Sequence, residues 1–173
     1  IASVNGHLEI AKVLIASGAL LDKADNDGRS PLYRANSNGH LEIVKVLIAS
    51  GALLDKADID GKTPLYIASS NGRLEIVNVL IASGALLDKA NTYGITPLCI
   101  ASWYGKLKIV KVLIASGALL DKADNDGETP LFEASWIDYL EIVKVLIASG
   151  ALVDKANNDG RTPLSIASWN GRL

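Results

Sequence analysis

Acidic residues recur in this chain at a spacing that is typical of calcium ligands. The motif Asp-x-Asp-Gly occurs at residues 25–28, 58–61 and 124–127, and calcium-binding loops place acids and a glycine in the same order. Aligning Gly127 with the loop glycine of such a site puts three carboxylates on ligand positions: those of Asp124, Asp126 and Glu133. Lys122 then takes the first ligand position, and Pro130 lies within the loop. We therefore predict no metal site, but solvated turns in which Asp side chains bond their own backbone.

The other reactive side chains do not form a catalytic set. Cys99 is the sole cysteine, which rules out an internal disulfide. Its position holds tyrosine, phenylalanine or serine in other copies of a repeated segment, so we interpret it as a packed helical side chain. His7 and His40 alternate with arginine and lysine at one position, which indicates surface side chains. No catalytic triad or phosphate-binding glycine loop is present in the sequence, and we predict neither an enzyme nor a bound cofactor.

Charge and hydropathy argue against two classes of partner. The formal net charge of −2 creates no field that would gather phosphates, so we expect no binding to nucleic acid or to anionic membranes. Gly or Asp interrupts each apolar run well before the roughly 18 residues that a membrane span requires. We expect a soluble intracellular protein of the cytoplasm, without membrane insertion.

The elements that position these residues follow from a strict internal repeat. The tripeptide Ser-Pro-Leu or Thr-Pro-Leu recurs every 33 residues, at 30–32, 63–65, 96–98, 129–131 and 162–164. A period of this length indicates one small unit copied in tandem. Each copy is too small to bury its own apolar face and depends on its neighbours to do so.

Each unit is predicted to contain two helices joined by a tight turn. In residues 58–90, Thr63 is a good N-cap and Pro64 suits the first helical position. Gly72 ends this helix, because glycine adopts left-handed backbone at low cost. A second helix with one apolar stripe follows at about residues 74–83. The chain then returns through a short extended loop with a turn at its tip.

This unit closely resembles the ankyrin repeat family, in which Thr-Pro-Leu opens the first helix and Gly-His-Leu-Glu-Ile-Val opens the second. The resemblance covers the whole chain and implies an all-α solenoid of stacked helix-turn-helix units with short β-turn loops. The family usually has histidine after Thr-Pro-Leu, which this chain lacks, so we expect the stacking of the repeats but not the inter-loop hydrogen bonds that this histidine commonly provides. We expect full repeats at residues 25–57, 58–90, 91–123 and 124–156, and partial repeats at 1–24 and 157–173. Both ends fall within a unit and lack polar caps, and we interpret the chain as a segment excised from a longer array.

Comparison among the copies separates a constant half of the repeat from a variable half. The segment VLIASGALLDKA recurs unchanged at residues 13–24, 46–57, 79–90 and 112–123, and with one change at 145–156. Variation gathers instead in the first helix and the turn tip. In a solenoid these elements line up as one surface, and the resemblance implies that this surface is a concave face that binds a protein partner.

Large apolar residues enter the variable half in the later repeats. One helical position carries Trp103, Trp136 and Trp169, and its angle relative to the core stripe predicts an exposed ladder of indoles. Such aromatic strips are typical of binding hot spots, and the alternative is that each indole stacks on the neighbouring repeat. We predict that the contact residues are Tyr93, Ile95, Trp103, Tyr104, Phe132, Trp136, Ile137, Tyr139 and Trp169.

Two further features compete with this strip. One loop position carries a leucine in every repeat, and this sameness favours packing or self-association over recognition: Leu20, Leu53, Leu86, Leu119 and Leu152. A small basic cluster of Lys106, Lys108 and Lys111 could steer an acidic partner, with a solvated face as the alternative.

The sequence favours a protein–protein interaction module that binds its partner through the concave groove. The alternative is an architectural spacer or elastic scaffold segment of a larger multi-repeat protein. Weak self-association through exposed repeat ends is compatible with both hypotheses.

Overall fold

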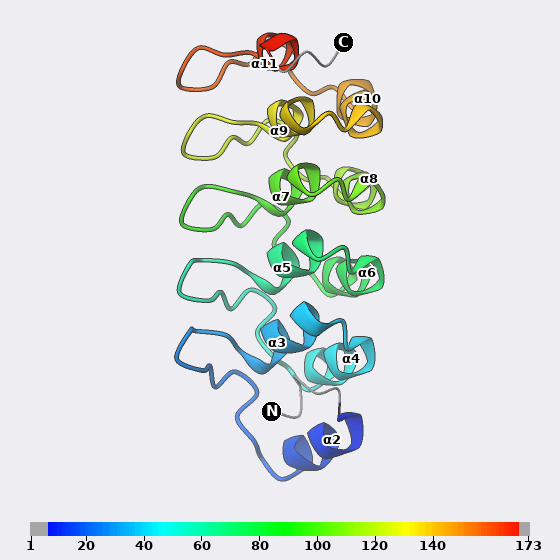
Figure 1. Cartoon of the computed structure of the whole chain (residues 1–173). Coiled ribbons are helices and arrows are strands. Elements are labelled where there is room, and N and C mark those ends of the chain that lie inside the picture. The colour runs from blue at the N-terminus through cyan, green and yellow to red at the C-terminus, as the bar shows by residue number, and fades with distance from the viewer. Residues whose placement is uncertain (1–6, 170–173) are drawn as a thin grey trace.

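The computed structural model describes residues 7–169, in which ten helices and no strand stack as a ladder of helix pairs (Figure 1). First helices form the middle column of Figure 1, second helices form the right column, and the turn tips project to the left. The first helices are α3 (Pro31–Asn38), α5 (Pro64–Ser70), α7 (Pro97–Trp103), α9 (Pro130–Ile137) and α11 (Pro163–Trp169). The second helices are α2 (Leu8–Ala16), α4 (Leu41–Ala49), α6 (Leu74–Ala82), α8 (Leu107–Ala115) and α10 (Leu140–Ala148). The predicted all-α solenoid is confirmed.

Local sequence explains where the first helices begin and end. Proline is the first residue of each, and the preceding Ser or Thr accepts a hydrogen bond from the backbone N–H three residues later in α3, α5, α7 and α9. Thr63, for example, caps α5 by accepting from the Tyr66 N–H at 3.1 Å, which satisfies a donor that the helix itself leaves unpaired. The turn into the second helix requires positive φ, which Gly72 adopts at 73°.

The fourth full repeat makes the same turn without glycine. Asp138 ends α9 in the left-handed region with φ of 73°, and it is the only non-glycine residue with positive φ in the described part of the chain. The backbone therefore keeps the geometry of the other repeats, although a side chain is strained there by about 1 kcal/mol.

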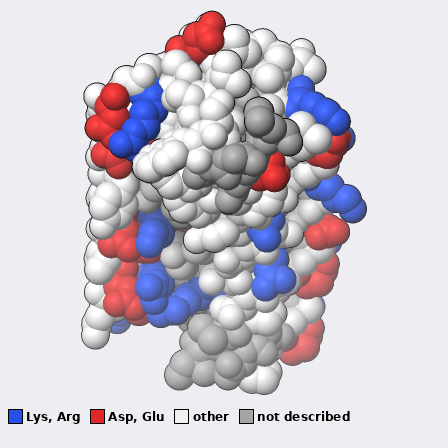
Figure 2. All heavy atoms as spheres, turned by 45° about the horizontal axis from the view of Figure 1, so that its top comes forward, with Lys and Arg blue, Asp and Glu red and all other residues white. Residues whose placement is uncertain are grey.

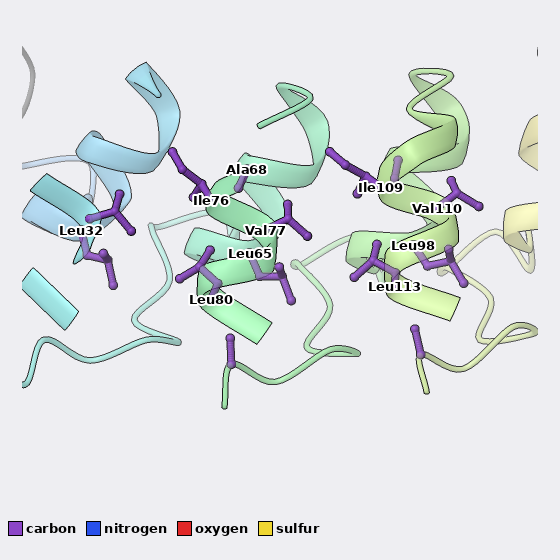
Figure 3. Close-up of a cluster of buried hydrophobic side chains, with 14 of the residues drawn as sticks. Leu32, Leu65, Ala68, Ile76, Val77, Leu80, Leu98, Ile109, Val110 and Leu113 are labelled. Carbon is purple, nitrogen blue, oxygen red and sulfur yellow. The ribbon is translucent and has the colours of Figure 1, made fainter. Parts of the chain in front are cut away.

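One continuous core extends along the stack from Ala11 to Ala151, and Figure 3 shows part of it. First helices α3, α5, α7 and α9 each contribute a leucine and an alanine, such as Leu65 and Ala68. Second helices α4, α6 and α8 each contribute an Ile, a Val and a Leu, such as Ile76, Val77 and Leu80. The small alanine lets first helices pack closely, because a larger side chain would hold them apart. The core residues lie between successive helix pairs in Figure 3, so each repeat depends on its neighbours for burial.

Two sets of hydrogen bonds join successive loops. At the tips, backbone N–H groups donate to carbonyl oxygens of the preceding repeat, as in Thr92 N to Asp60 O at 2.9 Å. At the loop base, Asp55 accepts from the Leu86 N–H at 3.0 Å, while its own carbonyl accepts from Lys89 Nζ at 2.8 Å. The same loop-base pair recurs from Asp22, Asp88 and Asp121 to the next repeat. We call this series the loop-base ladder.

Candidate interaction groove

First helices and turn tips enclose two adjoining hollows. The first has a volume of about 400 Å³ and is lined by α3, α5 and α7, and the second has a volume of about 430 Å³ and extends to α9 and the tip before it. They share four lining residues and therefore form one groove: Lys62, Tyr66, Ile100 and Tyr104. The groove lies on the variable half of the repeats, as the comparison of copies predicted.

Four of the predicted contact residues meet in this groove. Trp103 and Tyr104 follow one another at the end of α7, while Tyr93 and Ile95 lie on the turn tip of the same repeat. Trp103 is 40% exposed, and Tyr93 and Tyr104 are also exposed. The structure thus gathers three accessible aromatic rings and a half-buried isoleucine in one repeat, beside the buried Tyr66.

Phe132 is a correction to the predicted contact set. It is only 1% exposed, because its position in the first turn of α9 faces inward, so it has no surface to offer a partner. The sequence argument placed it in the set because it is large and lies on a variable helix. Its position carries buried side chains in other repeats too, at Tyr33, Tyr66 and Cys99.

The indoles do not form a uniform ladder. Trp136 is half-buried, with its ring centroid 6.3 Å from that of Phe132 one helical turn away. Trp169 is 69% exposed and lies under the Arg161 guanidinium, 5.2 Å from the ring centroid. Of the three tryptophans, Trp103 alone lines either groove hollow.

Ile137 and Tyr139 lie beyond the lining of these hollows. Both are half-buried, and Tyr139 is the residue before α10, where it packs against the core. Its ring covers Gly105 of the preceding repeat so closely that a Cβ at Gly105 would come within 2.7 Å of it. Tyr139 therefore joins two repeats rather than presenting a free ring.

Three turn tips carry an internal ion pair, and the other two do not. The aspartate of the tip pairs with a cation two residues later: Asp27 with Arg29 at 2.7 Å, Asp60 with Lys62 at 2.8 Å, and Asp159 with Arg161 at 3.6 Å. The third full repeat replaces this pair with Tyr93 and Ile95, and the fourth has Asp126 and Glu128. In Figure 2, Lys and Arg lie among Asp and Glu on both sides of the visible face.

The fourth repeat brings three carboxylates together at the groove. One oxygen from each of Asp124, Glu128 and Glu133 lies within 4.8 Å of the others. Glu133 is 4% exposed, and its Oε2 has no hydrogen-bond partner in the described structure. Burial, with the nearby Glu128 and Asp124 carboxylates, raises the pKa of Glu133 to about 8. The sequence analysis did not consider Glu128, although comparison with Arg29 and Lys62 at the same position could have identified it.

The remaining predicted features are placed as follows. Cys99 is buried, and burial raises the pKa of its thiol to about 11, which confirms a packed side chain.

Packing does not explain the loop leucines, because they are 56–74% exposed; it is their backbone N–H groups that the loop-base ladder uses. Lys108 and Lys111 are exposed, while the chain of Lys106 runs beside Gly72. No helix between residues 7 and 169 is both long and apolar enough to cross a membrane.

Comparison with known families agrees with this architecture. A family model described as ankyrin repeats (3 copies) matches four overlapping stretches, at residues 1–91, 53–124, 86–155 and 119–173, which together cover the chain. A search of curated proteins finds no match.

Proposed function

The chain belongs to the ankyrin repeat family, and from this premise we propose that it binds a protein partner in the groove of its first helices and turn tips. Members of the family generally act as protein–protein interaction modules, and they are typically scaffolds rather than enzymes. The observation that carries the proposal is the group of Tyr93, Trp103 and Tyr104, three exposed aromatic rings in one hollow of the variable half.

These rings suit a binding anchor because they combine large area with little freedom. Trp103 and Tyr104 are fixed at the end of a helix, and the tip that carries Tyr93 is held to its neighbours by backbone hydrogen bonds on both sides. Aromatic side chains lose few rotamers on binding, and a preformed surface has little ordering cost left to meet. A partner that fills this hollow with an apolar side chain gains contact area at small entropic cost.

The electrostatics of the adjoining hollow favour apolar recognition over charge. Its cations are already engaged: Arg29 with Asp27, Arg34 with Asp25, and Lys62 with Asp60. Neutralised pairs at half-exposed positions add little affinity. We therefore place the binding energy on the aromatic residues of the third full repeat.

The test compares one tryptophan inside the groove with one outside it. The purified chain, Trp103→Ala and Trp169→Ala serve as baits in parallel captures from cell extract, and each captured protein is purified and titrated against all three. We expect Trp103→Ala to weaken binding about 30-fold, which corresponds to the roughly 2 kcal/mol of a hot-spot residue. Trp169→Ala should leave affinity unchanged.

Denaturant unfolding of the same variants separates binding from stability. The free energy of unfolding of Trp103→Ala should stay within about 1 kcal/mol of the parent value, as for a substitution at a half-exposed site. If captured proteins bind Trp103→Ala normally, the groove proposal fails, and the architectural spacer takes its place. The repeated loop-base ladder is the observation that favours that second function.

A further inference from the structure

The fourth full repeat lacks the cations that balance the acidic tips of other repeats. In three other tips, an aspartate forms an ion pair with the cation two residues later, which is Arg29, Lys62 or Arg161. In the fourth repeat, the residue at this position, two after Asp126, is the acid Glu128. The backbone of the tip is unchanged, since Asp124 Oδ1 accepts the Asp126 and Glu128 N–H groups at 3.0 and 2.8 Å, as the matching aspartates do elsewhere. The fold is the same and only the charge is reversed.

A second position repeats this reversal. In the first full repeat, the Arg34 guanidinium on α3 donates to Asp25 Oδ2, with Nε at 2.9 Å. The equivalent residues three repeats later are Glu133 and Asp124, so a carboxylate stands where the guanidinium was. The charges that act on Glu133 are those of Glu128 and Asp124, both of which repel its anion. Two cations have been replaced by two acids around one aspartate.

Glu133 is the strongest sign that something is missing from this cluster. Its side chain is buried at the groove, and its Oε2 accepts no hydrogen bond in the described structure. An unpaired buried carboxylate costs several kcal/mol, whereas repeats two and three avoid that cost with Ile67 and Ile100 at the same position. Glu133 therefore either holds a proton or needs a positive group to reach it.

We propose that Asp124, Glu128 and Glu133 form a binding site for a hard divalent cation such as Ca²⁺. One oxygen from each lies within 4.8 Å of the others, so an ion at the centre of the three is at most about 2.8 Å from each oxygen, close to the calcium–oxygen distances of roughly 2.3–2.6 Å. Three carboxylates offer up to six oxygens, and water can complete the shell. The ligands come from the turn tip and from α9, one helical turn beyond Pro130.

This set differs from the loop that the sequence analysis rejected. Lys122 takes the first ligand position of that loop, but Lys122 Nζ donates to the Asp88 carbonyl at 2.7 Å and belongs to the loop-base ladder. Pro130 does not obstruct a ligand loop either, since it starts the helix that carries Glu133. The site is thus formed by tertiary structure and not by consecutive loop positions.

A metal ion fits the cluster better than a lysine or arginine of a partner. The unpaired Glu133 oxygen is almost inaccessible, so a planar guanidinium could not approach it without displacing its neighbours. A bare ion of about 1 Å radius needs no such opening. The inference is independent of the proposed function, because an ion binds this site in the isolated chain.

Calorimetric titration of the chelator-treated protein with CaCl₂ tests the inference. We expect a single saturable site, with a dissociation constant at least tenfold weaker in Glu133→Gln. Glu133→Ile, which copies repeats two and three and so preserves the fold, should abolish binding. Glu141→Gln is the matched control, because Glu141 is an exposed carboxylate on α10 that pairs with Lys144 at 2.8 Å. This variant should bind calcium with the affinity of the parent.

Two results would overturn the inference. One is the absence of binding with Ca²⁺, Mg²⁺ and Mn²⁺ up to about 10 mM, which exceeds the dissociation constants of weak calcium modules. The other is calcium binding that both Glu133 variants retain at parental affinity. Loss of a captured protein in Glu133→Gln, without metal binding by the parent, would instead assign the carboxylates to a cationic side chain of the partner.

Discussion

The back of the stack and its groove use the same repeat in opposite ways. On the back, the loop bases repeat the same residues and the same hydrogen bonds between successive copies, and the second helices repeat a nearly constant apolar stripe. Along the groove, equivalent positions change from cation to apolar to acid, as Arg29, Ile95 and Glu128 do. The difference shows that stability and recognition are assigned to separate faces, so that one can change while the other stays fixed.

Truncation of a core leucine on the back should have the largest effect. Leu80 on α6 is fully buried, and we expect Leu80→Ala to lower the free energy of unfolding by about 2–5 kcal/mol, since it leaves a cavity between repeats. Urea titration monitored by helical circular dichroism measures this change. The control is Leu86→Ala in the same repeat, where the leucine is exposed and the loss should be below about 0.5 kcal/mol. Equal losses in the two variants would contradict the assignment of stability to the buried stripe.

Glu133 should make the groove side sensitive to pH in metal-free buffer. Its pKa in the folded chain is about 8, above the ordinary value of 4.5, so the folded state holds a proton that the unfolded state has released. The stability that this proton contributes is complete below pH 4.5 and is lost as pH rises through 8. Over this range the free energy of unfolding should fall by on the order of a few kcal/mol. Unfolding titrations of the parent and Glu133→Gln across this range measure the effect, which the variant should lack. Parallel pH profiles would show that Glu133 is not the group responsible.

Tyr33 joins two repeats on the groove side, and its loss should have a smaller effect. Its hydroxyl donates to Asp58 Oδ2 of the next repeat at 2.9 Å, and burial and this bond raise the pKa of the phenol far above its ordinary range. Tyr33→Phe should lower the free energy of unfolding by about 1–3 kcal/mol, because it leaves a buried carboxylate oxygen without a donor. The double-mutant cycle with Asp58→Asn isolates this bond, and additive losses would mean that the bond contributes little.

Asp138→Gly should give the smallest change, and it should be stabilising. Relief of the left-handed strain predicts a gain of a few tenths to about 1 kcal/mol in the free energy of unfolding. The other repeats already have glycine at this point, so the back should be unaffected. Lower stability in chemical denaturation would indicate that the Asp138 side chain makes a contact worth more than the strain.

The 33-residue repeat, together with the proline and glycine residues at the helix ends, was sufficient to predict the fold from sequence. Proline after Ser or Thr marks helix starts such as Pro64, and glycine marks turns such as Gly72, because both effects are local and act through the backbone. Side-chain burial within the variable helix was harder to predict. Trp103 and Phe132 are both large and apolar on similar helices, yet only the three-dimensional packing shows that one faces the groove and the other the core.

The carboxylate cluster was missed for a different reason. The loop motif places Asp124 and Glu133 on ligand positions but counts Lys122 with them, whereas the cluster takes its third carboxylate from Glu128, which the motif does not count. Alignment of the copies with one another, position by position, would have revealed that Glu128 and Glu133 stand where Arg29 and Arg34 stand in the first repeat.

The loop-base ladder has a consequence for how such a chain can be rearranged by gene duplication and deletion. Each repeat presents the same aspartate and carbonyl to the next, and receives the same N–H and ammonium from it. Removing residues 58–90 as a block would therefore bring Asp55 to Leu119 and Lys122 with the same bonds that it makes to Leu86 and Lys89. Recombination between copies can thus reorder the groove, placing basic, aromatic and acidic tips in new succession, while every joint between repeats stays as it was.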